Sequence, residues 1–581
     1  MKSLRRIFRF MRPYWRPALV AIVLVFGMVV SDLSIPRLTQ RVIDQGILAE
    51  DLPAILTTSA VMLGMATMGA LFAVGNTIMS VRVAQSVAAD VRSAIVRQVQ
   101  SLAFGNLDRL QTGQLLVRAT SDVNMVQTIM MLGLRMLIRA PLWMFGSFGM
   151  LLATGGAVVT VTLALMPFIL AMIVFFLVKA TPLFHLVQER LDALNQVLQE
   201  NLSGIRVVKA FVRAEHESAR FDKVNTTYTA TNLQVMQMLA FILPTLILII
   251  NLGIAGVIWF GGQQVISGDL SMGQIVASFN YLAFTLFPML MLAAMIGPLS
   301  AANASAERIL EVLDSVPDVC PPAAPQEPAE ARGRVAFEGV TFSYNGQHQA
   351  PVLKHIDLVA EPGQTVAILG ATGSGKSSLV HLIPRFYDVA EGRVTLDGVD
   401  AREWALESLR GQVGIAMQEA VLFSGTIRDN LRYGRPDATD AEVEAAAKVA
   451  QAHDFITALP DGYDTVLGQR GVNLSGGQKQ RLSIARALVV RPRVLILDDS
   501  TSAVDVETEA KLQAALAPLM RESTTFVIAQ RISTVLTADK IVVLDRGEIA
   551  AIGTHAELLA TSPIYREIYD SQLGEGRTNY G

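Results

Sequence analysis

Six long apolar segments in the first half of the chain restrict its possible folds more than any other feature. They cover approximately residues 18–36, 54–81, 136–154, 157–178, 239–262 and 275–299. Each is close to the ~20 residues that a helix needs to cross a bilayer, where an unpaired backbone N–H or C=O is not tolerated. We therefore expect an all-α transmembrane domain of six spans. An even number of spans puts both ends of that domain on the same side of the membrane.

Length and composition indicate that a second, soluble part follows. A chain of 581 residues predicts roughly two to four domains. Its hydrophobic fraction of 51% is too high for a wholly soluble protein, although the second half reads as ordinary globular sequence. A net charge of −3 argues against a nucleic-acid-binding protein, whose surface would be basic. The one cysteine, Cys320, excludes an intrachain disulfide and is consistent with the reducing cytosol.

Lysine and arginine predict the orientation in the membrane. They are frequent in the N-terminal arm and in the connections 82–135 and 179–235, whereas 155–156 and 263–274 have none. The positive-inside rule then places both chain ends in the cytoplasm, in a multi-pass protein of the inner (cytoplasmic) membrane. In residues 3–15, arginines and apolar side chains predict an amphipathic helix on the inner membrane face, which Pro17 separates from the first span.

The two long connections are expected to be helical. Residues 82–103 and 186–211 carry apolar side chains at helical spacing, so the spans continue as helices into the cytosol. Short breaks near 104–112 and 211–217 would be tips that can touch a soluble domain. Polar side chains at membrane depth are candidate substrate contacts, although helix packing or a place at the interface is the commoner explanation; they are Asp32, Asn76, Arg135, Arg139, Asn251 and Asn280.

A glycine-rich motif in the second half carries the chemistry. After a proline-rich linker at 317–333, the segment 370–377 reads G-x-x-x-x-G-K-S between an apolar strand-like run and a predicted helix. Backbone N–H groups of such a loop wrap phosphate oxygens, Lys376 would reach the β- and γ-phosphates, and the Ser377 hydroxyl would bind Mg²⁺. An accidental glycine turn is disfavoured by the flanking strand and helix. The motif predicts a nucleoside triphosphate site.

Further motifs follow in a fixed order. Gln418 follows a strand-like run, Leu474–Gln478 opens a predicted helix, and an apolar strand ends in Asp498 and Asp499. The segments 502–505 and 526–530 come next. This order and spacing resemble the nucleotide-binding domain of an ABC transporter, and six spans before it resemble an ABC exporter half-transporter. The resemblance implies a multidomain fold with a membrane domain at 1–316, the linker 317–333, an α/β P-loop NTPase domain at 334–570 and a tail at 571–581.

The resemblance also implies roles for individual residues. Tyr344 would stack on adenine, Gln418 would touch Mg²⁺ and sense the transmembrane tips, and Asp498 would support Mg²⁺ through water. The signature residues Ser475, Gly476 and Gly477 would cap the γ-phosphate of a nucleotide held by a second subunit. One copy of each motif therefore requires at least a dimer. The remaining nucleotide-binding candidates are Gly370, Ala371, Thr372, Gly373, Ser374, Gly375, Lys376, Ser377, Ser378, Gln478 and Asp505.

Two departures from the family fall at the hydrolytic centre. Asp499 stands where the family has a glutamate general base, and Gln530 stands where it has a histidine. A carboxylate one methylene shorter is displaced from the attacking water, and glutamine cannot carry positive charge. Position 469 is also glutamine where a glutamate is usual. Tolerated drift is the alternative explanation. Two losses beside an intact signature favour the degenerate half of a heterodimeric exporter, whose own site is slow.

The sequence thus predicts ATP-driven export of a hydrophobic or amphipathic drug, lipid or peptide, with ATP and Mg²⁺ as cofactors. Asp499, Gln530 and Gln418 are the candidate catalytic residues. The predicted partners are a second half-transporter with an intact Glu/His site, and membrane lipid. A homodimer with Asp499 as a slow base and a non-hydrolysing ATP-binding regulatory subunit remain alternatives. The spans exclude a soluble ABC ATPase, and the fusion of both parts disfavours an importer.

Overall fold

The computed structural model describes residues 2–154, 157–326, 331–344, 350–528 and 535–573. The chain divides into two compact units, each with its own packing. The first comprises residues 1–98 and 113–314, and the second comprises residues 99–112 and 315–581. Residues 99–112, from the first half of the chain, therefore pack within the second unit.

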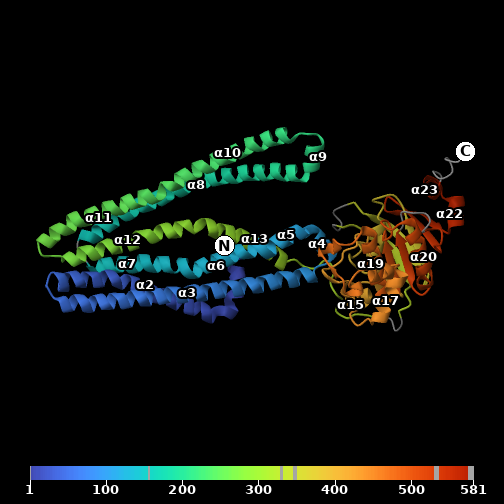
Figure 1. Ribbon diagram of the computed structural model, residues 1–581, viewed down its shortest axis with the longest axis horizontal. Coiled ribbons are helices and arrows are strands. Elements are labelled where there is room, and N and C mark those ends of the chain that lie inside the picture. The colour runs from blue at the N-terminus through green and yellow to red at the C-terminus, as the bar shows by residue number, and fades with distance from the viewer. Residues whose placement is uncertain (1, 155–156, 327–330, 345–349, 529–534, 574–581) are drawn as a thin grey trace. The chain divides into compact units, whose positions relative to one another are not determined.

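The first unit is all helical (Figure 1). Within the described residues, six helices are long and apolar enough to cross a membrane: Lys2–Ile47, Leu52–Ser101, Thr112–Thr154, Val159–Ser203, Ala214–Ile266 and Met272–Leu313. The helical segments of this unit are α1 (Lys2–Ile7), η1 (Phe8–Tyr14), α2 (Trp15–Arg41), η2 (Val42–Ile47), α3 (Leu52–Ser101), α5 (Thr112–Val117), η3 (Arg118–Asp122), α6 (Val123–Leu132), η4 (Gly133–Leu137), α7 (Arg139–Thr154), α8 (Ala157–Ser203), the short α9 (Ile205–Ala210) between two of the long helices, α10 (Ala214–Ala240), α11 (Ile242–Ile266), α12 (Met272–Ala294) and α13 (Ile296–Leu313).

Hydrogen bonds between helices hold α2, α7 and α12 together. The Ser147 and Thr285 hydroxyls are 2.8 Å apart and buried between α7 and α12. The Tyr281 hydroxyl of α12 donates to the carbonyl oxygen of Leu33 in α2 at 3.0 Å. At membrane depth a buried hydroxyl needs such a partner, because no water is available to replace it.

The N-terminal arm differs from the predicted single amphipathic helix. It is a short α-helix, α1, followed by the 3₁₀ segment η1, which contains Pro13. Pro17 does not end the arm, because it lies in the first turn of α2, where a missing N–H costs no hydrogen bond. Leu4 and Ile7 are buried, and α1 packs on α13 with an ion pair between Arg6 and Asp314 at 2.7 Å. The apolar face of α1 is thus covered by protein.

The long helices continue beyond the predicted spans, with one additional break. As expected, α3 runs through residues 82–101, and α4 (Phe104–Leu110) follows in the first predicted tip. The second predicted break, near 211–217, is present as a turn at 211–213 before α10 begins at Ala214. A further break that was not predicted lies at Gly204, between the end of α8 at Ser203 and α9, because glycine disfavours a helix interior and here is the N-cap of α9. The predicted turn at 155–156 lies outside the described residues.

The second unit is an α/β domain built on two main sheets. A six-stranded sheet has the order β12-β11-β3-β10-β9-β6, and a four-stranded antiparallel sheet has the order β2-β1-β4-β5. The strands are β1 (Val335–Phe342), β2 (Leu353–Ala360), β3 (Thr365–Leu369), β4 (Glu391–Leu396), β5 (Val399–Asp400), β6 (Val413–Ala416), β7 (Gly425–Thr426), β8 (Val466–Leu467), β9 (Val494–Asp498), β10 (Thr524–Ile528), β11 (Lys540–Asp545) and β12 (Glu548–Gly553). The helices besides α4 are α14 (Lys376–His381), α15 (Leu406–Gly411), α16 (Ile427–Leu431), α17 (Asp440–Val449), α18 (His453–Thr457), α19 (Gly476–Val489), α20 (Val506–Met520), α22 (His555–Thr561) and α23 (Pro563–Leu573).

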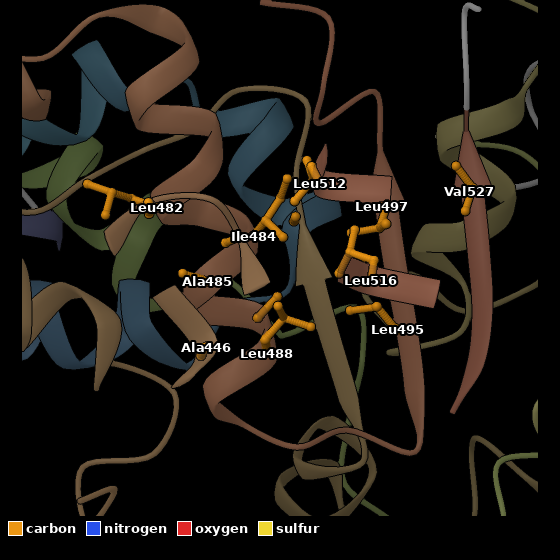
Figure 2. Close-up of a cluster of buried hydrophobic side chains, with 14 of the residues drawn as sticks. Ala446, Leu482, Ile484, Ala485, Leu488, Leu495, Leu497, Leu512, Leu516 and Val527 are labelled. Atoms are coloured by element: carbon orange, nitrogen blue, oxygen red, sulfur yellow. The ribbon is translucent and has the colours of Figure 1, made fainter. Parts of the chain in front are cut away.

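Alternating side chains of the six-stranded sheet supply two cores. On β9, Leu495 and Leu497 face α19 and α20, as Figure 2 shows, whereas Val494 and Ile496 belong to the core shared with the four-stranded sheet. Successive side chains of a strand point to opposite faces, so an uninterrupted apolar run is required here. Strands β3, β10, β9 and β6 are parallel, with Ile528 opposite Asp498 and Ile368. Their carboxyl ends therefore lie at one edge, where ligands of such sheets bind.

Candidate nucleotide-binding site

The loop between β3 and α14 has the conformation that a phosphate cradle requires. Gly370, Gly373 and Gly375 have φ values of +151°, +83° and +101°, which L side chains rarely adopt. A Cβ at Gly370 would lie 2.2 Å from the carbonyl oxygen of Leu544, so no other residue fits there. The Ser374 hydroxyl oxygen is buried and has no hydrogen-bond partner among the described residues. A buried orphan of this kind fits a ligand that supplies the missing partner, such as a phosphate oxygen.

The Lys376 ammonium lies over this loop. Its Nζ donates to the carbonyl oxygens of Gly370 and Ala371 at 2.9 Å each. Burial lowers the pKa of Lys376, and the negative charges of Asp498 and Asp499 oppose that shift. A cation held at the rim of a glycine loop is placed to bind an anion. The pocket beside it has a volume of about 420 Å³ and extends to α23.

Ser377 and Asp498 face each other at the end of β9. The Ser377 hydroxyl donates to Oδ1 of Asp498 at 3.0 Å, and the Asp498 side chain is only 4% exposed. Burial raises the pKa of Asp498, while the Ser377 hydrogen bond and the charges of His381 and Lys376 lower it. Among the described residues no three His, Cys, Asp or Glu side chains form a metal cluster. The pair fits Mg²⁺, which takes few protein ligands and several from phosphates and water.

Asp499 and Gln418 come together from neighbouring strand ends. The side-chain amide of Gln418 donates to Oδ2 of Asp499 at 3.4 Å. Asp499 is buried and has φ +45°, a left-handed conformation that aspartate tolerates better than most residues. Its carbonyl oxygen accepts from the Ser502 hydroxyl at 3.1 Å. The third predicted catalytic residue, Gln530, lies outside the described residues.

The signature segment forms the start of α19. The Ser475 hydroxyl accepts from the backbone N–H of Gln478, and the Gln478 side chain accepts from the backbone N–H of Ser475, a capping box. Buried Gln480 binds both Ser502 and the backbone N–H of Ala503, which ties α19 to the segment after β9. Gly476 lines a pocket of about 280 Å³ together with Gln418. The signature and the glycine loop thus line different pockets of this chain.

Asp505 has a structural contact as the N-cap of α20. Its carboxylate accepts from the backbone N–H of Thr508 at 2.9 Å, and this bond lowers the pKa of Asp505. Tyr344 lies near the glycine loop, since its hydroxyl is 2.7 Å from that of Ser378. Its ring packs edge-on against Phe342 and Tyr387 with centroids 5.0 and 5.2 Å away.

Comparison with known proteins identifies this arrangement. Residues 18–289 match the family described as ABC transporter transmembrane region, and residues 353–502 match the family described as ABC transporter. An uncharacterized ABC transporter ATP-binding protein of Bacillus subtilis, YfiB, is 39% identical over 98% of this chain and 99% of its own length. The chain belongs to the ABC transporter family. A second relative of this ABC transporter is an ATP-dependent lipid A-core flippase of Chromohalobacter salexigens, 36% identical over 98% of both chains.

A solved structure extends the likeness to the whole fold. A bacterial Atm1-family ABC exporter with ATP bound superposes with a TM-score of 0.79 and 28% identity, over 96% of this chain and 98% of that one. The predicted fold and family are therefore confirmed: this ABC transporter is a half-transporter of the exporter type, with six apolar helices and one nucleotide-binding domain in a single chain. ATPase activity coupled to transport is the activity of this family.

For one contact within the nucleotide-binding unit, the sequence predicted one partner and not the other. The first tip, α4, stacks Phe104 on Phe386 with ring centroids 4.3 Å apart, and Asp108 accepts from the Tyr387 hydroxyl at 2.8 Å. The tip was expected from the sequence, whereas the aromatic residues that receive it were not. The signal that could have found it was the adjacent aromatic pair Phe386-Tyr387 in the segment that follows α14.

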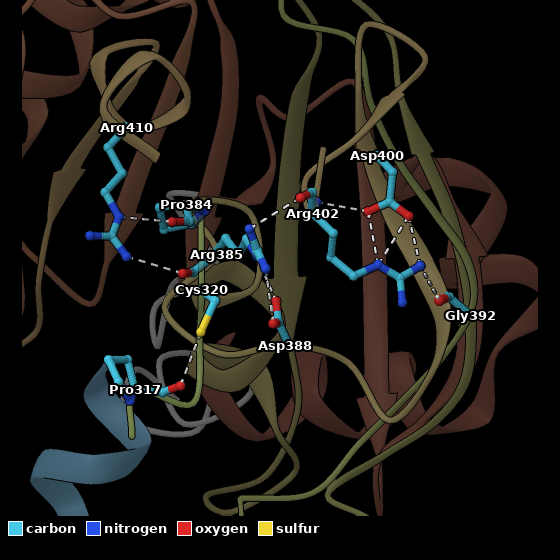
Figure 3. Close-up of polar contacts among 9 residues, drawn as sticks. All are labelled: Pro317, Cys320, Pro384, Arg385, Asp388, Gly392, Asp400, Arg402 and Arg410. Carbon is cyan, nitrogen blue, oxygen red and sulfur yellow. Dashed lines mark hydrogen bonds and ion pairs between the residues drawn. The ribbon is translucent and has the colours of Figure 1, made fainter. Parts of the chain in front are cut away.

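Two arginines stabilise the turn that carries the aromatic receptor of α4, Phe386 and Tyr387. Arg385, which is buried, pairs with Asp388, and Arg410 donates to the carbonyl oxygens of Pro384 and Arg385 at 3.2 and 3.1 Å (Figure 3). Burial lowers the pKa of Arg410. The Arg410 guanidinium thus satisfies two carbonyls of the turn that carries Phe386, and the Arg385 guanidinium ties the same turn to Asp388, which together restrict the position of the receptor ring.

The predicted linker is also tied to α4. Asn106 donates to the carbonyl oxygen of Val316 at 2.9 Å and accepts from the backbone N–H of Asp318 at 2.9 Å. Arg109 binds both carboxylate oxygens of Asp318 at 2.8 Å. The start of the 317–333 linker is thus held to the second unit.

Proposed function

We propose that this ABC exporter subunit is one half of a heterodimer whose own ATP site hydrolyses slowly. The supporting observation is the place of Asp499. It follows β9, where the family carries its general base, and its carboxylate already accepts from Gln418. A glutamate would extend one methylene farther toward an attacking water, and general-base catalysis requires that reach. The intact signature on α19 would complete a competent site on a partner that carries Glu and His.

The nucleotide contacts are proposed as follows. The loop 370–378 and Lys376 hold the phosphates, Tyr344 stacks on adenine, and Ser475, Gly476, Gly477 and Gln478 serve the nucleotide of the partner. Asp505, already an N-cap, would contribute at the same interface. Ser377, Gln418 and Asp498 would hold Mg²⁺, whose chemistry is to neutralise charge on the β- and γ-phosphates. The orphan Ser374 hydroxyl and the glycine geometry support this assignment.

The nucleotide retained by the chain tests the slow site. The full chain, purified alone in lipid, is incubated with Mg-ATP and washed, and the bound nucleotide is identified by chromatography. We expect wild type to retain ATP, Asp499→Glu to retain mostly ADP, and Lys376→Ala to retain neither. Equal ADP on wild type and Asp499→Glu would contradict the proposal and favour a homodimer in which Asp499 is the base. ATP retained unchanged by Asp499→Glu would favour a non-hydrolysing regulatory subunit.

A hydrophobic or amphipathic substrate is the proposed cargo. Two apolar pockets of the first unit support this class. One, of about 510 Å³, is lined by Phe168, Met172 and Phe175 among others, and the other, of about 550 Å³, includes Phe241 and Lys179. Aromatic and methionine side chains adapt to varied apolar shapes. Relatives named as a lipid A-core flippase and as a putative multidrug export protein of Staphylococcus aureus support the same broad class.

We further propose the domain limits 1–316, 317–333, 334–570 and 571–581, with both chain ends cytoplasmic in the inner membrane. Cys320 provides the test of the orientation, because it is the one cysteine of the chain and is exposed. A membrane-impermeant thiol reagent should label it in inside-out vesicles and leave it unlabelled in intact cells. Asp269→Cys in a Cys320→Ser background should show the opposite pattern. Labelling of Cys320 from outside the cell would reverse the proposed orientation.

A further inference from the structure

His381, the last residue of α14, faces the carboxylate of Asp498 and has no part in the function proposed above. Its Nε2 lies 3.6 Å from Oδ2 of Asp498. This nitrogen is buried and makes no hydrogen bond within the described part of the chain. The other carboxylate oxygen, Oδ1, accepts from Ser377 at 3.0 Å. Asp498 therefore has one potential donor directed at each of its two oxygens.

The imidazole ring also contacts an aromatic residue that packs on the tip α4. The His381 and Phe386 ring centroids are 5.7 Å apart, and Phe386 stacks on Phe104 of α4 at 4.3 Å with an interplanar angle of 22°. Contacts thus run without a gap from Phe104 through Phe386 and His381 to Asp498. Gln418, the residue predicted to sense the tips, is not a member of this chain of contacts.

We propose that His381 is a positioning residue for Asp498, and that through Phe386 it makes the orientation of that carboxylate depend on how α4 is seated. The proposal rests on the proposed function in one respect, namely that Asp498 supports Mg²⁺. A carboxylate that supports a metal needs hydrogen bonds of its own to fix its orientation, and losing such a bond weakens metal binding. A proton on Nε2, which one neutral tautomer and the charged ring both carry, would be donated to Oδ2 of Asp498, 3.6 Å away.

The test measures binding rather than turnover. A fluorescent ATP analogue is titrated onto the full chain in lipid nanodiscs at a series of Mg²⁺ concentrations. We expect His381→Leu to raise the half-saturating Mg²⁺ concentration about 10-fold and to leave Mg²⁺-free nucleotide affinity unchanged. His381→Gln should restore the wild-type value, because its amide nitrogen reaches as far as Nε2. The matched control is His453→Leu, since His453 faces Glu444 at 3.8 Å in the same domain and should have no effect.

A second comparison tests the link to α4. Phe104→Ala should raise the half-saturating Mg²⁺ concentration about 3-fold, and the effect should shrink in the His381→Leu background, because residues that act through one another are not additive. Additive effects would contradict the link. If His381→Leu lowers the Tm so far that the protein does not fold, His381→Met replaces it in both comparisons.

Two results would overturn the positioning role: wild-type Mg²⁺ dependence in His381→Leu, or a glutamine variant no better than leucine, which would reduce the histidine to a space-filling residue. These outcomes are distinct from failure of the proposed function. If wild type bound no nucleotide at all, the proposed ATP site itself would be wrong.

Discussion

The side-chain amide of Gln418 lies 3.4 Å from the carboxylate of Asp499, and the two residues come from the ends of β6 and β9, which are adjacent in the sheet. This contact joins the residue expected to sense the membrane tips to the residue expected to activate water. Because the aspartate is buried beside a donor, its short side chain is held back at the sheet edge. The central claim of a slow site depends on this geometry.

Gly477 should tolerate no side chain. A Cβ there would lie 2.8 Å from the carbonyl oxygen of Ala503, a backbone atom that cannot move aside without shifting the segment after β9. We expect Gly477→Ala to cost about 1–3 kcal/mol and to lower the Tm of the nucleotide-binding domain. Gly411→Ala is the control, because nothing lies within 4 Å of its added Cβ. Equal thermal denaturation of the two variants would show that this close approach does not constrain the fold.

Asn106 should control how firmly the segment after α13 is held. It is buried and bonds both Val316 and Asp318. Removing it leaves those backbone groups unpaired, at about 1–3 kcal/mol. In Asn106→Ala, hydrogen exchange at the Asp318 amide should accelerate at least about 5-fold. Exchange unchanged from wild type, or accelerated equally by the control Asn303→Ala, would contradict this role.

The ion pair between Asp32 and Arg139 should stabilise the packing of α2 on α7 rather than contact substrate. The two side chains meet at 3.0 Å between α2 and α7, and the guanidinium lies 3.9 Å from the Trp143 ring centroid. Arg139→Gln and Asp32→Asn should each lower the Tm in nanodiscs. The double variant should lose less than the sum, with a coupling of about 1 kcal/mol. If the stability losses of the two single variants simply added in the double variant, the ion pair would not be stabilising and a substrate role for both residues would be favoured.

Much of the site was predictable because its motifs are local. Gly370–Ser377 and Leu474–Gln478 form their turns and caps from residues a few positions apart, so spacing alone located them. The Phe104–Phe386 stack and the Asn106–Asp318 bond join distant segments, and no local pattern reports them. Gly204 was missed because the apolar spacing of α8 suggested that the helix continues past it. Pro17 was misjudged because proline is tolerated in the first turn of a helix.

Glu442 should make stability depend on pH. It accepts from the backbone N–H and hydroxyl of Thr439 at the start of α17, and these bonds with Arg435 lower its pKa to about 2. Because the folded-state pKa lies below the unfolded value of 4.5, the stabilisation is complete above pH 4.5 and is lost as the pH falls toward 2. The Tm advantage of wild type over Glu442→Gln should therefore be larger at pH 7 than at pH 3.5. A difference independent of pH, like that expected for the exposed control Glu522→Gln, would contradict it.

The steady-state ATPase rate of the chain purified alone in lipid tests the central claim most directly. Wild type, Asp499→Glu and Lys376→Ala are compared at saturating Mg-ATP. We expect little turnover by wild type, a rise of at least about 10-fold with Asp499→Glu as the carboxylate regains its reach, and none with Lys376→Ala. Robust wild-type turnover that Asp499→Glu does not increase and Lys376→Ala abolishes would contradict the slow site and leave a homodimeric exporter.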